Sequence, residues 1–103
     1  MNIALIGFGE AGLAIANSLG QRDGDRASLR AFDIKLADDD DDVAAAMAAR
    51  IAGAGVQMSP SPADAVGDAD IVISVVTADQ AATAAALTAL HLPQGALYLD
   101  MNS

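Results

Sequence analysis

Three glycines near the N-terminus have a spacing that could hold a phosphate group. They are Gly7, Gly9 and Gly12, in the stretch GFGEAG. Glycines at this spacing permit a tight turn after a strand, a close approach of the backbone to a pyrophosphate, and close packing of the following helix. The same glycines could serve only as a turn between a strand and a helix, so the spacing alone leaves two interpretations open.

An acidic residue farther along the chain favours the phosphate interpretation. Asp33 follows Gly12 by about 20 residues, the distance at which a carboxylate ending the second strand can accept hydrogen bonds from an adenosine ribose. A 2′-phosphate would meet this carboxylate as a like charge, so the sequence favours NAD over NADP, although Lys35 could turn toward such a phosphate. Glu10 is expected to face solvent, because an inward carboxylate would oppose the pyrophosphate. The sequence therefore predicts a dinucleotide cradle.

The elements that must position these residues alternate between strand and helix. Apolar runs typical of buried strands lie at 2–6, 28–33, 56–58, 70–76 and 96–100. Apolar spacing and alanine runs predict helices at 11–19, 42–55 and 79–90, with one helical turn at 63–66. Right-handed crossovers between such units predict an α/β fold with a doubly wound parallel sheet of strand order 3-2-1-4-5. Such a sheet binds ligands at the carboxyl ends of its strands, where the glycines and the acid both lie.

Composition limits the classes of partner. The chain of 103 residues is long enough for one domain, and its formal charge of −9 would repel nucleic acid and anionic membranes. It contains no cysteine, which excludes disulfides and thiolate metal sites. Because no apolar run approaches the roughly 20 residues that cross a bilayer, and no signal-like segment is present, we expect a cytoplasmic protein.

Other polar residues give no catalytic constellation. The acidic run from Asp38 to Asp42 lacks the interleaved glycine of a calcium loop, so we interpret it as a solvated loop and helix start rather than a metal site. His91 is the single histidine and falls in a turn before the last strand, at the edge opposite the predicted ligand crevice. We therefore expect a solvated loop histidine and no metal ligands.

Taken together, four stretches resemble the N-terminal domain of the β-hydroxyacid dehydrogenases, the superfamily of 3-hydroxyisobutyrate and 6-phosphogluconate dehydrogenases. They are NIALIGFGEAGLAIANSL, the FD that ends in Asp33, DADIVISVV and LYLDMNS. The resemblance covers nearly the whole chain, and the ending Asp-x-(Ser/Asn)-Ser is more particular to this group than the glycine motif shared by many Rossmann-fold enzymes. It implies a Rossmann-type fold and hydride transfer between a nicotinamide cofactor, NAD or else NADP, and a 3-hydroxy acid or related substrate.

By that resemblance, the site residues fall into groups along the chain. The pyrophosphate lies on the loop formed by Gly7, Phe8, Gly9, Glu10, Ala11 and Gly12. Asp33 holds the adenosine ribose, and Val76 and Thr77 line the cofactor. Asn102 and Ser103 match the family's substrate-loop positions, although the family usually has serine where this chain has Asn102. On spacing alone, Asp100 and Asn102 could instead cap a turn.

The same resemblance implies that the catalytic residue lies outside this chain. In the family a lysine acts as general acid and base, and it comes from a helix beyond the cofactor domain, where a further all-helical domain completes the pocket. We therefore interpret residues 1–103 as a truncated cofactor domain that binds cofactor and catalyses little or nothing alone, its parent a homo-oligomer assembled through the missing domain. An exposed outer edge of the last strand agrees with truncation. A stand-alone module that senses NAD or NADH through an oligomeric interface stays open, and the substrate is not identified.

Overall fold

The computed structural model describes residues 1–23 and 28–101, and its centre is a parallel sheet of five strands. The strands are β1 (Asn2–Ile6), β2 (Ser28–Phe32), β3 (Gln57–Met58), β4 (Ile71–Ser74) and β5 (Leu97–Asp100). Their order is β3-β2-β1-β4-β5, which confirms the predicted topology. Because β1 pairs in parallel with both β2 and β4, the carboxyl ends of these three strands meet at one edge of the sheet.

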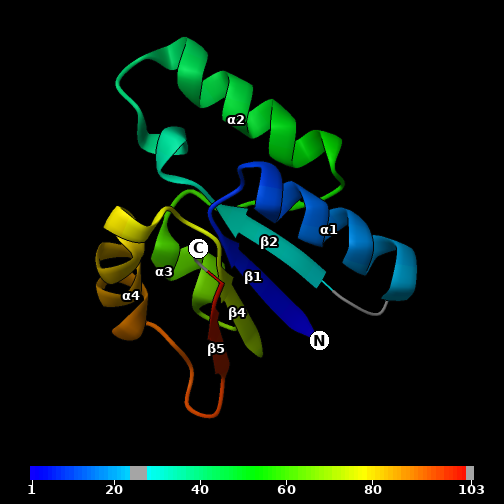
Figure 1. The fold of residues 1–103 in the computed structure, drawn as a ribbon, viewed down its shortest axis with the longest axis vertical. Coiled ribbons are helices and arrows are strands. Elements are labelled where there is room, and N and C mark those ends of the chain that lie inside the picture. The colour runs from blue at the N-terminus through cyan, green and yellow to red at the C-terminus, as the bar shows by residue number, and fades with distance from the viewer. Residues whose placement is uncertain (24–27, 102–103) are drawn as a thin grey trace.

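Helices cover the two faces of this sheet (Figure 1). The helices α1 (Glu10–Asp23) and α2 (Asp41–Gly53) contribute to the core on one face, and α3 (Pro62–Val66) and α4 (Ala81–Ala89) to the core on the other. Two short 3₁₀ helices, η2 (Ile34–Ala37) and η3 (Ala78–Gln80), follow β2 and β4. None of the helices in the described ranges is long and apolar enough to cross a membrane.

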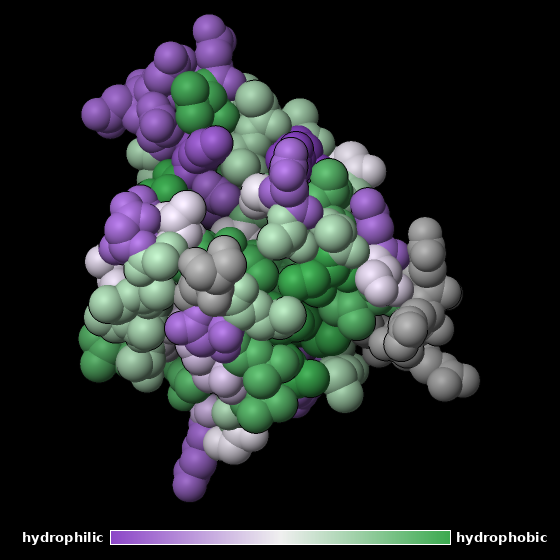
Figure 2. All heavy atoms as spheres, in the orientation of Figure 1, coloured by the Kyte–Doolittle hydropathy of each residue, from purple (hydrophilic) through white to green (hydrophobic). Residues whose placement is uncertain are grey.

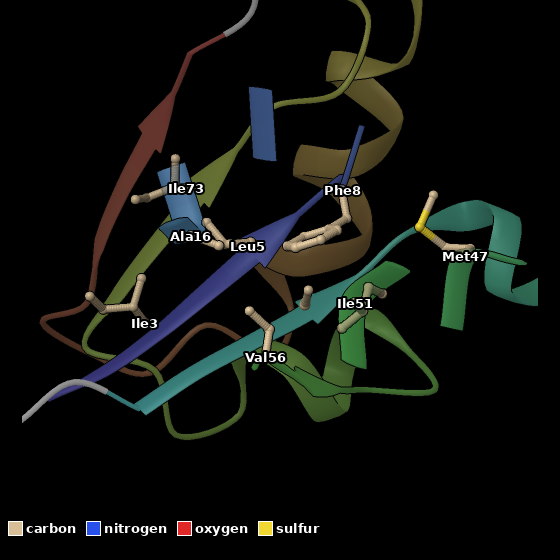
Figure 3. Close-up of a cluster of buried hydrophobic side chains, with 9 residues drawn as sticks. Ile3, Leu5, Phe8, Ala16, Met47, Ile51, Val56 and Ile73 are labelled. Atoms are coloured by element: carbon tan, nitrogen blue, oxygen red, sulfur yellow. The ribbon is translucent and has the colours of Figure 1, made fainter. Parts of the chain in front are cut away.

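Strand β1 is enclosed on both faces, as its continuous apolar sequence predicts. Ile3 and Leu5 enter the cluster shared with α1 and α2, whereas Ala4 and Ile6 enter the cluster shared with α3 and α4. All four are at most 5% exposed. Figure 3 shows the first cluster, in which Phe8 lies beside Leu5 at the end of the strand. The glycine loop therefore leaves the most buried strand of the sheet.

Several element boundaries differ from the sequence expectation by a few residues, and two of these differences have a local explanation. Helix α1 continues through Gly20 to Asp23 instead of ending at Leu19, since a glycine in a helix interior costs only about 1 kcal/mol relative to alanine. Strand β4 ends at Ser74 instead of Val76, because its partner β1 ends at Ile6 and the chain there turns away. Val75 still donates its N–H to the Ile6 carbonyl at 2.9 Å, and the chain leaves the sheet after this bond.

Candidate functional site

The glycine loop begins with a turn that only glycine makes without strain. Gly7 has a φ of 97°, and its N–H donates to the Phe32 carbonyl at 2.8 Å, which extends the β1–β2 ladder by one bond. A Cβ at Gly7 would lie 3.1 Å from the backbone carbonyl of Val75. The left-handed backbone and the neighbouring chain both require a residue without a side chain here.

The other two glycines of the motif have opposite surroundings. A Cβ at Gly12 would lie 2.6 Å from the carbonyl oxygen of Gly7, so helix α1 packs against the loop with no room for a methyl group. A Cβ at Gly9 would meet nothing within 4 Å. Gly12 is thus required by packing within the protein, whereas Gly9 is surrounded by space that a ligand could occupy.

Asp33 directly follows β2, and its carboxylate bonds to the glycine loop. Its Oδ2 accepts the N–H of Phe8 at 2.7 Å, and its Oδ1 accepts the N–H of Lys35 at 2.9 Å. The second contact caps η2, where Asp33 is the N-cap residue with extended backbone. A carboxylate has about four acceptor sites, so about two remain after these contacts. The side chain is partly buried, between the loop and the end of β2.

Phe8 and Arg50 fix the loop from the side of α2, a role that sequence reasoning missed. The Phe8 side chain is fully buried in the cluster that includes Met47 and Ile51 of α2 (Figure 3). Its carbonyl accepts from Arg50 Nε at 3.0 Å. Phe8 therefore offers no side chain to a ligand. In the sequence, Arg50 stands out only as the single basic residue of an alanine-rich helix. No spacing rule connects that residue to the glycine loop.

A cavity of about 280 Å³ opens beside the loop, between the carboxyl ends of the strands and the helices α3 and α4. Five of the predicted cofactor residues line it: Gly7, Gly9, Asp33, Val76 and Thr77. The rest of its wall includes Ile6, Phe32, Ile34, Lys35, Pro62, Val75, Gln80, Thr83, Ala84, Leu87 and Thr88. Four other predicted residues do not line it, namely Phe8, Glu10, Ala11 and Gly12. Glu10 opens α1 with an exposed side chain, so the expectation that it faces solvent is confirmed.

The α1 N-terminus follows the loop immediately. Because α1 begins at Glu10, its first N–H groups have no partner within the helix, and they carry the positive end of the helix dipole. Gly9 sits at the junction of this terminus and the cavity. Backbone donors, a helix terminus and an open glycine together form an arrangement suited to an anion.

The remaining polar residues lie away from this cavity or serve the fold. Asp38 accepts from the Asp40 N–H and Asp40 from the Asp42 N–H, so part of the acidic run caps the start of α2. His91 is exposed in the turn after α4, at the amino end of β5. Throughout residues 1–23 and 28–101, no three histidine, cysteine or acidic side chains gather as they would around a metal ion.

Of the C-terminal stretch predicted to contact the substrate, the structure describes the chain as far as Met101. Asn102 and Ser103 lie outside the described residues. Asp100 ends β5 opposite Ser74, and the Met101 N–H donates to the Ser74 carbonyl at 2.9 Å. The chain is thereby directed to the same carboxyl edge of the sheet as the glycine loop.

One family model matches almost the whole chain. The family described as NADP oxidoreductase, coenzyme F420-dependent, matches residues 2–103. Among functionally curated proteins, none matches this sequence.

Solved structures match over nearly the full length of the chain. A conserved hypothetical protein from Sinorhizobium meliloti has 37% identity and a TM-score of 0.87, with 99% of this chain and 32% of that one covered. The 3-hydroxyisobutyrate dehydrogenase of Mycobacterium tuberculosis has 24% identity and a TM-score of 0.76, over 98% of this chain and 31% of that one. Prephenate dehydrogenase from A. aeolicus, in complex with hydroxyphenyl propionate and NAD+, has 20% identity and a TM-score of 0.74, over 100% of this chain and 34% of that one. The last two similarities concern the fold, and the chain spans about a third of each of these proteins.

Proposed function

This chain belongs to the NADP oxidoreductase, coenzyme F420-dependent family, and we propose that it binds NAD as the cofactor domain of an oxidoreductase acting on a 3-hydroxy acid or related substrate. The family confirms the expected class of an NAD(P)-binding oxidoreductase domain with a Rossmann-type fold. The roles of individual residues, the preference for NAD and the substrate class are our proposals.

The observation that carries the proposal is that Gly9 and Asp33 line the same cavity. Gly9 presents open space where any Cβ would project, beside the N-terminus of α1. Asp33 lines the same cavity and retains about two acceptor sites beyond its bonds to backbone N–H groups. A dinucleotide needs a pyrophosphate site and a ribose site on one wall, and these two residues fit those needs.

The carboxylate of Asp33 also underlies the proposed preference between the two nicotinamide dinucleotides. Its free acceptor sites suit the two hydroxyls of an adenosine ribose. A 2′-phosphate at the same place would bring a second negative charge close to the carboxylate, and the two would repel each other. The family's description names NADP, and Lys35, exposed at the cavity wall, is the cation that could offset this repulsion. We propose that Asp33 dominates, because its carboxylate is fixed by two backbone bonds while Lys35 is exposed.

The nicotinamide half is assigned to the far side of the cavity. Val76 and Thr77 follow β4 and line that wall, and the chain after β5 reaches the same edge, so Asn102 and Ser103 are proposed as substrate-binding residues. The bound nicotinamide would supply hydride transfer. We propose that the general acid and base is a lysine outside residues 1–103, in a further domain, in keeping with the third of each matched protein that this chain spans. The 103 residues alone are then expected to bind cofactor without turnover.

Titration with NADH and NADPH, followed by nicotinamide fluorescence, tests this proposal. The unaltered chain is expected to bind NADH at least about tenfold more tightly than NADPH, a difference of about 1.4 kcal/mol. Asp33→Ser is expected to weaken NADH binding and to narrow that preference, because it removes the ribose acceptors and the like charge. Asp39→Ser removes the same charge from an exposed site on the acidic run and should leave both affinities unchanged. Failure of both nucleotides to bind at millimolar concentration would overturn the proposal.

A dinucleotide sensor is the second candidate function, favoured by the exposed apolar residues Leu97 and Leu99 on β5. If NADH binding changed how copies associate through that strand, sedimentation with and without NADH would show a change in mass. We expect NADH to bind without a change in assembly, which favours the oxidoreductase domain. A dinucleotide-driven change in mass would favour the sensor.

A further inference from the structure

We propose that Arg50 is a positioning residue that aims the Gly9 N–H at the pyrophosphate of the bound dinucleotide, acting through the Phe8 carbonyl. The inference rests on the proposed function, because it assigns one more residue to the same site. Arg50 is on α2, far from the glycine motif in sequence, and it lies outside the wall of the cavity. It would therefore act on the ligand through the backbone of the loop.

The contact is anchored at both ends. Arg50 Nε donates to the Phe8 carbonyl at 3.0 Å, and the guanidinium is partly buried. The next residue of α2, Ile51, is fully buried and belongs to the same cluster as the Phe8 ring. The position of α2 against the loop is thus set by apolar packing, and the guanidinium reaches the carbonyl from a fixed helix.

The geometry of the peptide bond converts this contact into a direction for the next N–H. The Phe8 carbonyl and the Gly9 N–H belong to one peptide group, and no cis peptide bond occurs in the described residues. In a trans peptide these two groups point in opposite directions. Arg50 holds the carbonyl toward α2, so the Gly9 N–H points away from α2. Gly9 lines the cavity on the other side of the loop, and no backbone bond of its N–H occurs in the described parts of the chain.

The peptide before Phe8 is held in the complementary way. Its N–H is bonded to the Asp33 carboxylate at 2.7 Å, so a negative group holds the donor and a positive group holds the following acceptor. Hydrogen bonds that include a charged partner are stronger than neutral ones. A glycine at position 9 could otherwise adopt many backbone conformations. These two contacts restrict that choice in the free protein, so less conformational entropy is lost when the ligand binds. The loop is prepared for an anion before the ligand arrives.

Two ligands separate an effect on the pyrophosphate from an effect on the whole site. ADP carries a pyrophosphate and adenosine carries none, while both fill the ribose site at Asp33. In Arg50→Met, ADP affinity is expected to fall about tenfold and adenosine affinity to stay within about twofold, because only the aligned phosphate donor is lost. Arg50→Lys should recover much of the ADP affinity, since an ammonium can still donate to the Phe8 carbonyl.

Arg30→Met is the matched control for charge. Arg30 lies on β2 and pairs with Asp68, and neither residue lines the cavity. This variant therefore loses the same charge and should keep the ratio of ADP to adenosine affinity. Circular dichroism confirms that each variant is folded at the temperature of the titration. In the free protein, the Gly9 amide resonance should broaden in Arg50→Met and stay sharp in Arg30→Met, because the peptide then exchanges between orientations.

The outcomes separate this inference from the function beneath it. If unaltered protein binds neither NADH nor ADP, the proposed function fails. If it binds both, and Arg50→Met lowers ADP and adenosine affinity equally or leaves both unchanged, the positioning role of Arg50 is wrong while the site stands. If Arg30→Met lowers the ratio as much as Arg50→Met does, the effect is one of overall charge, and the positioning role is again wrong.

Discussion

Strands β1 and β5 belong to the same parallel sheet and are both apolar in sequence, yet they are covered very differently. In β1, residues Ile3 to Ile6 are at most 5% exposed. In β5, Leu97 and Leu99 are 53% and 39% exposed, and Met101 just after it is 56% exposed. Figure 2 shows apolar side chains gathered on the face between α1 and β5. Parallel sheets normally have both faces covered, so β5 is the less covered side of this fold.

The difference shows where the site gains its rigidity. The glycine loop leaves β1 and is held by Asp33 of the β2 end, Arg50 of α2 and the buried Phe8 ring. The end of β5 is held to β4 by the strand ladder and one further backbone bond from Met101 to Ser74. We infer that the phosphate half of the site is preorganised by packing, and that the substrate half depends on the less covered strand.

A matched leucine substitution in the two strands tests this contrast and has the largest expected effect. Leu5→Thr should lower the free energy of unfolding by roughly 2–5 kcal/mol, because it leaves a cavity and buries a hydroxyl in the enclosed strand. Leu99→Thr should change it by no more than about 0.5 kcal/mol, because the side chain is already exposed and threonine suits a strand. Urea unfolding of both variants measures the difference.

A large loss in Leu99→Thr would break the comparison. If that loss also depended on protein concentration, β5 would be buried between copies of the chain in solution. Equal losses in the two variants at all concentrations would mean that β5 carries as much of the stability as β1.

A substitution within the glycine loop has the next largest expected effect. Gly12→Ala should lower the free energy of unfolding by roughly 1–3 kcal/mol, although alanine is the better helix former, because its methyl group would lie 2.6 Å from the Gly7 carbonyl oxygen. Thermal unfolding monitored by circular dichroism measures the change. A variant as stable as the unaltered chain would show that α1 can shift away from the loop, and that the loop is less rigid than inferred.

Much of the fold and part of the site could be predicted from the sequence, for physical reasons that are specific to certain residues. The alternation of apolar strands with helical segments, together with right-handed crossovers, predicts a doubly wound sheet, and the structure has the expected strand order. Gly7 and Asp33 are recognisable because a left-handed turn and a strand-ending acid have distinctive residue types and spacing. These features are local in sequence, and the structure brings both to the wall of one cavity.

Features that depend on packing between distant segments were not predictable. The contact of Arg50 depends on where α2 lies against the glycine loop, and that placement is set by packing between segments that are far apart in the sequence. Phe8 could have pointed to either side of the loop, and only the presence of Ile51 and Met47 on one side decides it. Met58 is apolar yet 45% exposed, because β3 is a two-residue strand at the sheet edge.

The measurement that tests the central claim most directly is NADH titration of Gly9→Ala beside the unaltered chain, with the stability of both determined. A methyl group at Gly9 meets nothing within 4 Å, so the free energy of unfolding should change by no more than about 0.5 kcal/mol. The same methyl group would occupy the space assigned to the pyrophosphate, so NADH affinity should fall by about tenfold or more. Gly9→Ala protein that is folded and binds NADH as tightly as the unaltered chain would contradict the account.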